Sequence, residues 1–393
     1  MQILEGSRAI AYTIKNIQPE VVSAYPITPQ THIVEDLAQF KADGKTEYEY
    51  VRAESEFAAA SVVEGASATG SRVYSATSSQ GLLLMTEVIY NIAGMRLPVI
   101  ITCANRGLSA PITIWNDHQD AMTVRDAGWM MFFAEDHQEA VDQHILAYKV
   151  AEKMKLPALI NIDGYILTHS YEPVNIPEYN RIQKFLPSRK RKNDKILDPQ
   201  KPITMGAFAA PPYYMEIREK LHNDLLSCTE EIQEQYDLYH QQIGNKKEKE
   251  GGKFSGYENG LVEYYGPKTP QTILVAMGSV VGTIKEAVDE FSGGLQGTCG
   301  VLKIKVYRPF PEEEIAKIMK KAKYMAVLDK SISLGNEGPL AGDMKALRST
   351  QNLKTKIQSF IVGLGGRDIT REMIKKIAKQ GKQKDSQVKF IGK

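Results

Sequence analysis

A hydroxyl, an arginine and a short polar run in the first third of the chain have the chemistry of a carboxylate receptor. Thr28 lies between Pro26 and Pro29, and this turn is stiff because each proline fixes φ and removes a backbone donor. Residues 77–80 read Thr-Ser-Ser-Gln, and Arg106 follows another apolar stretch. A guanidinium binds a carboxylate bidentately, so a hydroxyl beside it completes a receptor for a small carboxylate. The alternative is that the turn around Thr28 is only a rigid structural connection.

A carboxylate, Glu56, opens an alanine-rich segment at 56–66. In such a poorly hydrated setting a carboxyl group is protonated or bound to a base unless it is paired. Glu54 offers the same carboxylate two residues earlier, but the small residues that follow Ser55 favour Glu56 as the candidate site residue. A purely structural alternative stays open, in which Arg106 forms a salt bridge with Asp117 or Glu56.

The elements expected around these residues alternate between strands and helices. Short apolar runs rich in β-branched residues predict strands, and apolar residues at helical spacing predict helices. We expect strands at 20–24, 47–51, 72–76, 97–103, 129–133 and 157–163, and helices at 3–17, 33–40, 56–66, 82–93 and 137–154. This alternation predicts an α/β fold with a mostly parallel sheet covered on both faces. Ligands of such sheets bind where the strands end, so the candidate residues should meet at one edge.

The chain changes character after residue 170. Residues 171–260 are rich in proline, charge and aromatic side chains, which predicts a wrapping arm, a helix at 214–242 and a linker at 244–260. A second α/β unit follows, with strands expected at 271–277, 300–306, 324–329 and 357–362 and helices at 283–291 and 312–321. We therefore divide the chain into an α/β domain at 1–170, the arm, helix and linker at 171–260, and a smaller α/β domain at 261–393. The basic tail after residue 379 is expected to fray.

The overall composition argues against several classes of function. Lys plus Arg total 49 against 47 acidic residues, and this balance argues against broad binding to nucleic acid or a membrane surface. No apolar stretch approaches the roughly 20 residues that span a bilayer, and the first residues do not resemble a signal peptide. Cys103, Cys228 and Cys299 show no Cys-x-x-Cys spacing, so we expect no iron–sulfur cluster or structural zinc here. A reducing cytoplasm is the expected setting.

No spacing along the chain matches a metal or nucleotide site. His118, His137 and His144 are expected to be surface or hydrogen-bonding histidines, so no metal site is predicted within this chain. A phosphate-binding Gly-x-x-x-x-Gly-Lys-Ser/Thr loop is also missing. The loop 278–282, Gly-Ser-Val-Val-Gly, could hold an anion at a helix N-terminus, but a packing loop is favoured.

Several segments resemble a known family when they are taken in order along the chain. They are 25–29 (Tyr-Pro-Ile-Thr-Pro), 55–59 (Ser-Glu-Phe-Ala-Ala), 77–82 (Thr-Ser-Ser-Gln-Gly-Leu), 105–106 (Asn-Arg), 110–120, 163–169, 306–311 and 334–340. They look like the thiamine-diphosphate-binding half of the 2-oxoacid:ferredoxin oxidoreductases. Within that family the chain is most similar to the α subunits of the multi-subunit pyruvate:ferredoxin oxidoreductases, or pyruvate synthases. The resemblance covers most of the chain.

This resemblance implies both the fold and the site. It implies that 1–170 is a thiamine diphosphate pyrimidine-binding domain and that 261–393 resembles the C-terminal domain of transketolase. It gives Glu56 the catalytic role, a hydrogen bond to the aminopyrimidine ring that favours the tautomer able to deprotonate the thiazolium carbon. Thr28 and Arg106 would bind the substrate carboxylate. Further cofactor contacts are implied for Tyr25, Pro26, Ser79 and Gln80, and the second choices near the site are Asn105, Asn116, Asp117 and His118.

Two signatures of the complete enzyme are missing from the chain. The family holds the diphosphate through Mg²⁺ with a Gly-Asp-Gly segment, whereas residues 162–164 read Ile-Asp-Gly, and no cysteine-rich ferredoxin segment is present. The resemblance therefore implies a β subunit with the diphosphate and Mg²⁺ site, a γ subunit and a ferredoxin-like δ subunit. The 4Fe-4S clusters would lie in these partners, coenzyme A would be a co-substrate, and an external ferredoxin would accept the electrons. The chain alone is expected to be inactive.

The implied reaction is the oxidative decarboxylation of pyruvate with coenzyme A to acetyl-CoA and CO2, or the reverse synthesis, in anaerobic metabolism. The same chemistry on a branched-chain 2-oxoacid, 2-oxoglutarate or oxalate stays open. The space for the substrate side chain near Thr28 and the loop 112–115 would decide between these substrates. The sequence does not give the shape of that space. An alternative of another class is a non-catalytic scaffold subunit with the same fold.

Overall fold

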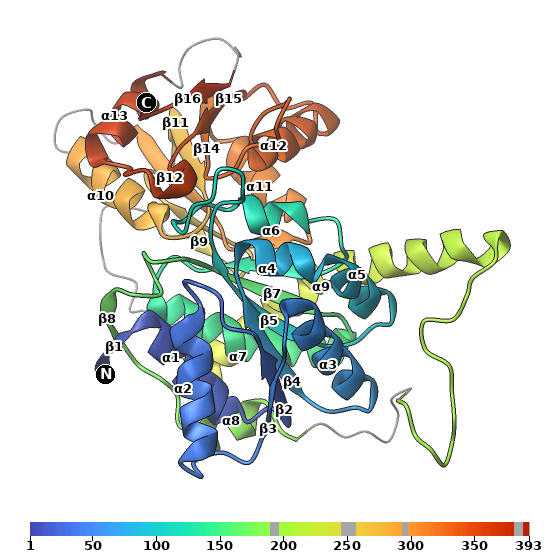
Figure 1. Cartoon of the computed structure of the whole chain (residues 1–393). Helices are drawn as coiled ribbons and strands as arrows, with labels where there is room; N and C mark the ends of the chain where they lie inside the picture. The colour runs from blue at the N-terminus through green and yellow to red at the C-terminus, as the bar shows by residue number, and fades with distance from the viewer. Residues whose placement is uncertain (189–195, 245–256, 293–297, 381–387, 393) are drawn as a thin grey trace.

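The chain forms two stacked α/β lobes, with the N-terminal lobe in blue to green and the C-terminal lobe in orange to red (Figure 1). This computed structural model describes residues 1–188, 196–244, 257–292, 298–380 and 388–392. Most of the linker predicted at 244–260 lies outside these residues. No helix among them is both long and apolar enough to cross a membrane.

The first lobe is built on a sheet that is parallel from β2 to β7. Its strand order is β13-β6-β7-β5-β4-β2-β3. The strands are β2 (Val21–Ala24), β3 (Glu49–Arg52), β4 (Val73–Thr77), β5 (Ile100–Asn105), β6 (Met130–Phe133) and β7 (Ala158–Asp163). The helices are α1 (Gly6–Ile17), α2 (Thr31–Ala42), α3 (Glu56–Ala68), α4 (Ser79–Leu84), α5 (Thr86–Gly94), α6 (Gln119–Thr123) and α7 (His137–Met154). The predicted fold class is confirmed.

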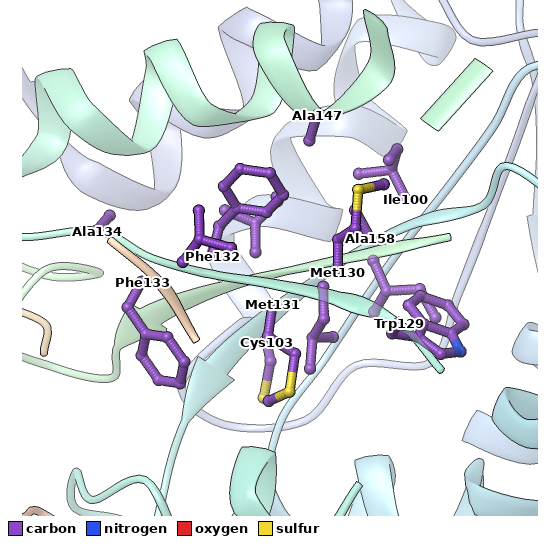
Figure 2. Close-up of a cluster of buried hydrophobic side chains, with 14 of the residues drawn as sticks. Ile100, Cys103, Trp129, Met130, Met131, Phe132, Phe133, Ala134, Ala147 and Ala158 are labelled. Carbon is purple, nitrogen blue, oxygen red and sulfur yellow. The ribbon is translucent and has the colours of Figure 1, made fainter. Parts of the chain in front are cut away.

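The strands of this sheet are apolar because helices cover both faces. All residues of β5, β6 and β7 are buried. Figure 2 shows how the side chains of β6 alternate, with Phe132 on the side of Ala147 from α7 and Phe133 and Met131 on the other side with Cys103. A strand buried on both faces does not need a polar face, which explains the continuous apolar run in the sequence.

Two predictions for the first lobe were wrong at their edges. Residues predicted to begin the first helix form β1 (Gln2–Glu5), which pairs antiparallel with β8 (Tyr171–Val174). The helix predicted at 82–93 is divided at Met85 into α4 and α5, and α4 already begins at Ser79. The spacing of apolar residues alone cannot reveal a short edge strand or a helix that is interrupted at one residue.

The second lobe carries a mixed sheet with the order β16-β15-β14-β11-β12-β10-β9. Its strands are β9 (Tyr257–Glu258), β10 (Val262–Tyr265), β11 (Thr272–Ala276), β12 (Cys299–Ile304), β14 (Tyr324–Asp329), β15 (Lys356–Ile361) and β16 (Lys389–Phe390). Its helices are α10 (Val280–Ser292), α11 (Glu312–Met319), α12 (Pro339–Thr350) and α13 (Arg371–Gln380). The tail was expected to fray, but β16 pairs in parallel with β15, so that expectation was wrong at residues 389–390.

One strand of the C-terminal segment belongs to the sheet of the first lobe. The strand predicted at 300–306 is divided into β12 and β13 (Val306–Arg308), and β13 pairs antiparallel with β6. The two lobes therefore share backbone hydrogen bonds as well as side-chain contacts.

The helix predicted at 214–242 is confirmed as α9 (Pro211–Gln242), which follows the short α8 (Tyr179–Phe185). The C-terminal half of α9 packs on α7 and buries Ile232 and Tyr239. Its N-terminal half projects from the first lobe together with the described part of the arm, and Tyr213 and Tyr214 are exposed there (Figure 1).

A buried ion pair joins the carboxyl edges of the two sheets. Asp163, at the end of β7, accepts a hydrogen bond of 2.8 Å from Lys330 Nζ, directly after β14. It also bonds His118 Nε2 at 2.6 Å and accepts from the backbone and hydroxyl of Ser279, after β11. Burial alone would raise the pKa of Asp163, but Lys330 and His118 hold that pKa well below its usual value.

Lys330→Met is expected to lower the free energy of unfolding of the full chain by about 3–5 kcal/mol at pH 7, because it removes the cation of a buried ion pair and leaves Asp163 with only His118 and Ser279 as partners among the described residues. Since the pKa of Asp163 is depressed, the stabilisation by the pair is present above the unfolded pKa and fades as the pH falls below it. The difference in free energy of unfolding between the wild-type chain and the variant should therefore become smaller at acid pH, where a proton neutralises Asp163. Urea unfolding at several pH values measures this.

The control is Lys41→Met, which breaks the exposed pair with Glu49, 3.7 Å apart, and should cost less than about 1 kcal/mol. Equal costs for both variants would contradict a stabilising role of the buried pair.

Candidate active site

The predicted site residues meet at the carboxyl edge of the first sheet. In the strand order, β2 lies between β3 and β4. The chain leaves β2 toward β3 on one side and continues from β4 toward β5 on the other. The loops after β2 and β4 therefore flank a topological switch point, which is where open α/β sheets bind ligands.

The loop after β2 is held in place by one buried amide. Gln30 Nε2 donates to the carbonyl of Tyr25 at 2.9 Å and to the carbonyl of Ala76, in β4, at 3.1 Å. Thr28, Tyr25 and Pro26 remain exposed at the rim. The loop therefore presents the Thr28 hydroxyl on a fixed backbone. We had not predicted the role of Gln30, because no motif or residue spacing in the sequence marks a glutamine in a loop as structurally important.

Arg106 lies against the same loop. Its Nη1 donates to the backbone carbonyl of Thr28 at 2.9 Å, and its Nε donates to the carbonyl of Thr113 at 2.6 Å. The guanidinium forms no ion pair within the described ranges, so the predicted alternative of a salt bridge with Asp117 or Glu56 is not found. Both N–H donors of Nη2 lack an acceptor from the described residues, although the residue is only 6% exposed. Burial lowers the pKa of Arg106.

Glu56 is the first residue of α3, at the end of the helix that favours a negative charge. Ser55 caps this end by accepting a hydrogen bond of 3.2 Å from the backbone of Ala58. Glu56 is 8% exposed, whereas Glu54 is exposed at the surface. No donor in the part of the chain that the structure describes bonds the Glu56 carboxylate.

Gly81 makes room for Glu56. A Cβ on Gly81 would lie 2.7 Å from Glu56 Oε1 and 2.6 Å from the hydroxyl oxygen of Thr77. The carboxylate thus lies beside the polar run 77–80 that follows β4. The buried hydroxyls of Thr77 and Ser78 have no protein partner among the described residues.

A buried carboxylate that we had not singled out, Asp120, holds two sides of the site together. Its Oδ2 accepts from the backbone N–H of Ser79 at 3.0 Å and of Arg106 at 2.9 Å. Its Oδ1 accepts from Asn105 Nδ2 at 3.0 Å and from the backbone N–H of Ala121 at 2.7 Å. Ser79 has a φ of 47°, a left-handed conformation that is unusual for serine, and this bond stabilises it. Burial raises the pKa of Asp120 to about 6.

This pKa gives a prediction for stability against pH. Because the native pKa of Asp120 lies above the unfolded value of 3.8, the native carboxyl keeps its proton longer than the unfolded one. Its contribution to the free energy of unfolding is therefore full below about pH 3.8 and is lost as the pH rises from there through about 6. Relative to Asp120→Asn, the wild-type chain should lose roughly 2–3 kcal/mol between pH 4 and 7. Urea unfolding of both chains measures the difference, and two parallel curves would contradict this assignment.

The other predicted residues divide between the rim and the support beneath it. Ser79 Oγ lies 2.6 Å from the carbonyl oxygen of Gly107 and 2.6 Å from Gln80 Oε1, and its single proton can be donated to either one, at the start of α4. Asn116 Nδ2 donates to the carbonyl of Asn105 at 3.2 Å. Asp117 Oδ2 accepts from the backbone N–H of Gly365 in the second lobe at 3.0 Å.

His118 was a second choice near the site, but its ring faces Asp163 at the contact between the lobes. It is buried there, as are Asn105, Asn116 and Asp117. These four residues brace the loop 107–118 against both lobes, and only the exposed part of that loop, which includes Ile112 and Trp115, faces outward.

The donors and acceptors at this edge fit half of a site for thiamine diphosphate. A buried carboxylate without a protein donor, beside hydroxyls without protein partners, suits a polar heterocycle such as an aminopyrimidine. The guanidinium of Arg106 suits a carboxylate. The described residues near this edge do not form a cluster of carboxylates that could bind a diphosphate through Mg²⁺.

Two family profiles match the chain. The first, described as "Pyruvate flavodoxin/ferredoxin oxidoreductase, thiamine diP-bdg", matches residues 12–237. The second, described as "Pyruvate:ferredoxin oxidoreductase core domain II", matches residues 271–374.

Proteins that match this chain over most of their length are named as subunits of 2-oxoacid oxidoreductases. The chain is 44% identical to pyruvate synthase subunit PorA of Methanosarcina barkeri, over 98% of this chain and 93% of that protein. It is 42% identical to the PorA subunit of Methanocaldococcus jannaschii, over 100% of this chain and 98% of that protein. It is also 38% identical to ketoisovalerate oxidoreductase subunit VorA of Pyrococcus horikoshii, over 97% of this chain and 94% of that protein.

A solved structure shares the fold. It is the 2-oxoglutarate:ferredoxin oxidoreductase of Magnetococcus marinus with 2-oxoglutarate, coenzyme A and succinyl-CoA bound, with a TM-score of 0.72 at 19% identity. The match covers 97% of this chain and 65% of that one.

Proposed function

The chain belongs to the pyruvate flavodoxin/ferredoxin oxidoreductase family, and we propose that it works as the α subunit of a pyruvate synthase. With its partner subunits it would convert pyruvate and coenzyme A to acetyl-CoA and CO2 with reduction of ferredoxin, or catalyse the reverse reaction. The observation that carries this proposal is the buried Glu56 carboxylate at the same sheet edge as Arg106, whose guanidinium has donors to spare.

Thiamine diphosphate, when bound, supplies a nucleophilic carbon for the decarboxylation of a 2-oxoacid. The part of this chain is to hold the aminopyrimidine end, with Glu56 as the partner of a ring nitrogen and Tyr25, Pro26, Ser79 and Gln80 around it. A carboxyl group with little access to water can share its proton with a ring nitrogen over a short hydrogen bond. Glu56 would thereby fix which nitrogen of the ring carries the proton.

Arg106 and Thr28 would bind the carboxylate of the substrate. The bonds to the carbonyls of Thr28 and Thr113 fix the guanidinium plane and leave Nη2 for a ligand. A fixed plane loses little entropy on binding, so a small 2-oxoacid can be oriented by a few contacts.

A β partner subunit would cover this edge and supply the diphosphate and Mg²⁺ half of the cofactor site. Large apolar side chains surround the rim and are exposed, with Ile112 at 77% and Trp115 at 52%. Exposed apolar surface of this kind marks an interaction site. The other exposed members of this surface are Tyr25, Phe57 and Leu84. The γ and ferredoxin-like δ subunits would supply the 4Fe-4S clusters and the route to external ferredoxin.

The second candidate is the same chemistry on a branched-chain 2-oxoacid. It is favoured by the 38% identity to a ketoisovalerate oxidoreductase subunit, which is slightly below the 40–44% identity to the pyruvate synthase subunits. The loop with Ile112 and Trp115 faces the same rim and would limit the length of the substrate.

The proposal is tested by purifying the native complex that contains this chain and assaying ferredoxin reduction with pyruvate, ketoisovalerate and 2-oxoglutarate in the presence of coenzyme A. We expect pyruvate to give the highest kcat/KM and the chain alone to give no turnover. A complex that turns over none of these acids would support a scaffold subunit and overturn the proposal.

A further inference from the structure

We propose that Glu5, His32 and His169 form a binding site for a divalent first-row transition ion of the Zn²⁺ type. The ligand atoms that these side chains offer all lie within 4.8 Å of one another. Two imidazoles and one carboxylate, with a further position for water, are a known ligand set for Zn²⁺. Other ions of this series bind the same donors.

Three separate segments bring these side chains together. Glu5 ends β1, His32 lies in the first turn of α2, and His169 lies in the turn between β7 and β8. The ligands are thus far apart in sequence, and no spacing along the chain could reveal them. This explains why we expected no metal site from the sequence.

The geometry of the three side chains is close to what an ion requires. His32 Nδ1 lies 2.6 Å from Glu5 Oε1. The rings of His32 and His169 have centroids 4.8 Å apart and planes inclined by 37°. Metal–nitrogen bonds of about 2.0–2.1 Å place ligand atoms roughly 3.3 Å apart in a tetrahedral site. This spacing lies between the 2.6 Å that separates His32 Nδ1 from Glu5 Oε1 and the 4.8 Å within which all three ligand atoms lie.

A hydroxyl orients the second imidazole. His169 Nδ1 lies 2.7 Å from Thr168 Oγ1, and the same oxygen accepts from the backbone N–H of Tyr165 at 2.8 Å. The oxygen has two lone pairs, so it can accept from the His169 ring as well. Metal-ligating histidines commonly donate their second ring N–H in this way, which would leave Nε2 of His169 as the ligand atom.

The cluster lies at the base of the active-site rim. His32 follows closely after the loop that carries Thr28. His169 stacks on Tyr165 at 4.7 Å, and Tyr165 stacks on Trp115 at 4.7 Å. An ion here would join the first turn of α2 to the turn that supports Trp115. Its role would be to make the rim rigid, and it would take no part in the chemistry.

The test is a Zn²⁺ titration of the untagged full chain, in competition with a chromophoric chelator. We expect one ion per chain, and we expect His32→Ala and His169→Ala each to weaken Zn²⁺ affinity at least ~100-fold, because each removes a direct ligand. Thr168→Val should weaken it about 10-fold, as loss of an orienting partner does. X-ray absorption at the zinc edge should show two imidazoles.

The matched control is His222→Ala, which removes an exposed histidine of α9 outside the cluster and should leave the affinity unchanged. Circular dichroism and melting curves verify that each variant is folded, and the exposure of His32 makes its substitution tolerable. Equal affinity in the wild type and in the His32→Ala, His169→Ala double variant overturns the proposal. So does a wild-type chain that takes no Zn²⁺ from the chelator.

Discussion

Glu56→Gln is expected to lower kcat of the assembled complex by about 10²–10⁴-fold, the range typical for loss of a positioned proton-transfer group. The amide has nearly the same shape and stays buried at the start of α3, so the fold should be retained. It cannot hold an acidic proton, however, and so it cannot share one with a ring nitrogen. The measurement is substrate-dependent ferredoxin reduction, together with the thiamine diphosphate content of the purified complex.

Glu54→Gln is the matched control, because it removes the same group two residues away at an exposed position. We expect it to keep wild-type activity. If the Glu54→Gln complex were inactive and the Glu56→Gln complex were active, Glu54 would be the catalytic residue instead. Activity in both variants would remove the glutamate from the mechanism.

Arg106→Ala is expected to lower kcat/KM for the 2-oxoacid by about 100-fold or more, mainly through a higher KM. A hydrogen bond to a charged group contributes roughly 1.5–3 kcal/mol, and the guanidinium offers more than one to a carboxylate. The loss should be smaller for Arg106→Lys, which keeps the charge but not the planar fork. Steady-state kinetics with varied 2-oxoacid at saturating coenzyme A separate KM from kcat.

Arg125→Ala is the control for this change, since Arg125 follows α6 and pairs loosely with Asp126 at 3.9 Å. It should leave both constants unchanged. If Arg106→Ala lowered kcat without raising KM, Arg106 would act in the chemical step and the assignment to substrate binding would be wrong. Equal KM for coenzyme A in all variants verifies that the effect is specific to the acid.

The parts of the fold that were predicted correctly include the run from β2 to α3 and the long helices α7 and α9. The strands among them follow from their short apolar runs rich in β-branched residues. The convergence of Thr28 and Arg106 at one edge follows from the rule that parallel strands end on the same side. The bond between Arg106 and the carbonyl of Thr28 confirms that these two residues meet.

The parts that could not be predicted depend on contacts between distant residues. Asp120 was visible only as the last letter of a motif, and its role arises because Ser79 and Arg106 aim backbone donors at it. Asp163 stood in a segment noted for its missing glycine, whereas its partner Lys330 comes from the other lobe. Buried polar groups need partners, but sequence does not say which partner the fold supplies.

The strand β13 has a consequence for whether the two lobes can be encoded by separate genes. Because β13 completes the first sheet beside β6, and Lys330 pairs with Asp163, a polypeptide that stopped at residue 244 would expose the β6 edge of the sheet and leave Asp163 without its lysine. Splitting the gene there would create two products that each need the other in order to fold. The two lobes should therefore be lost or kept together in evolution.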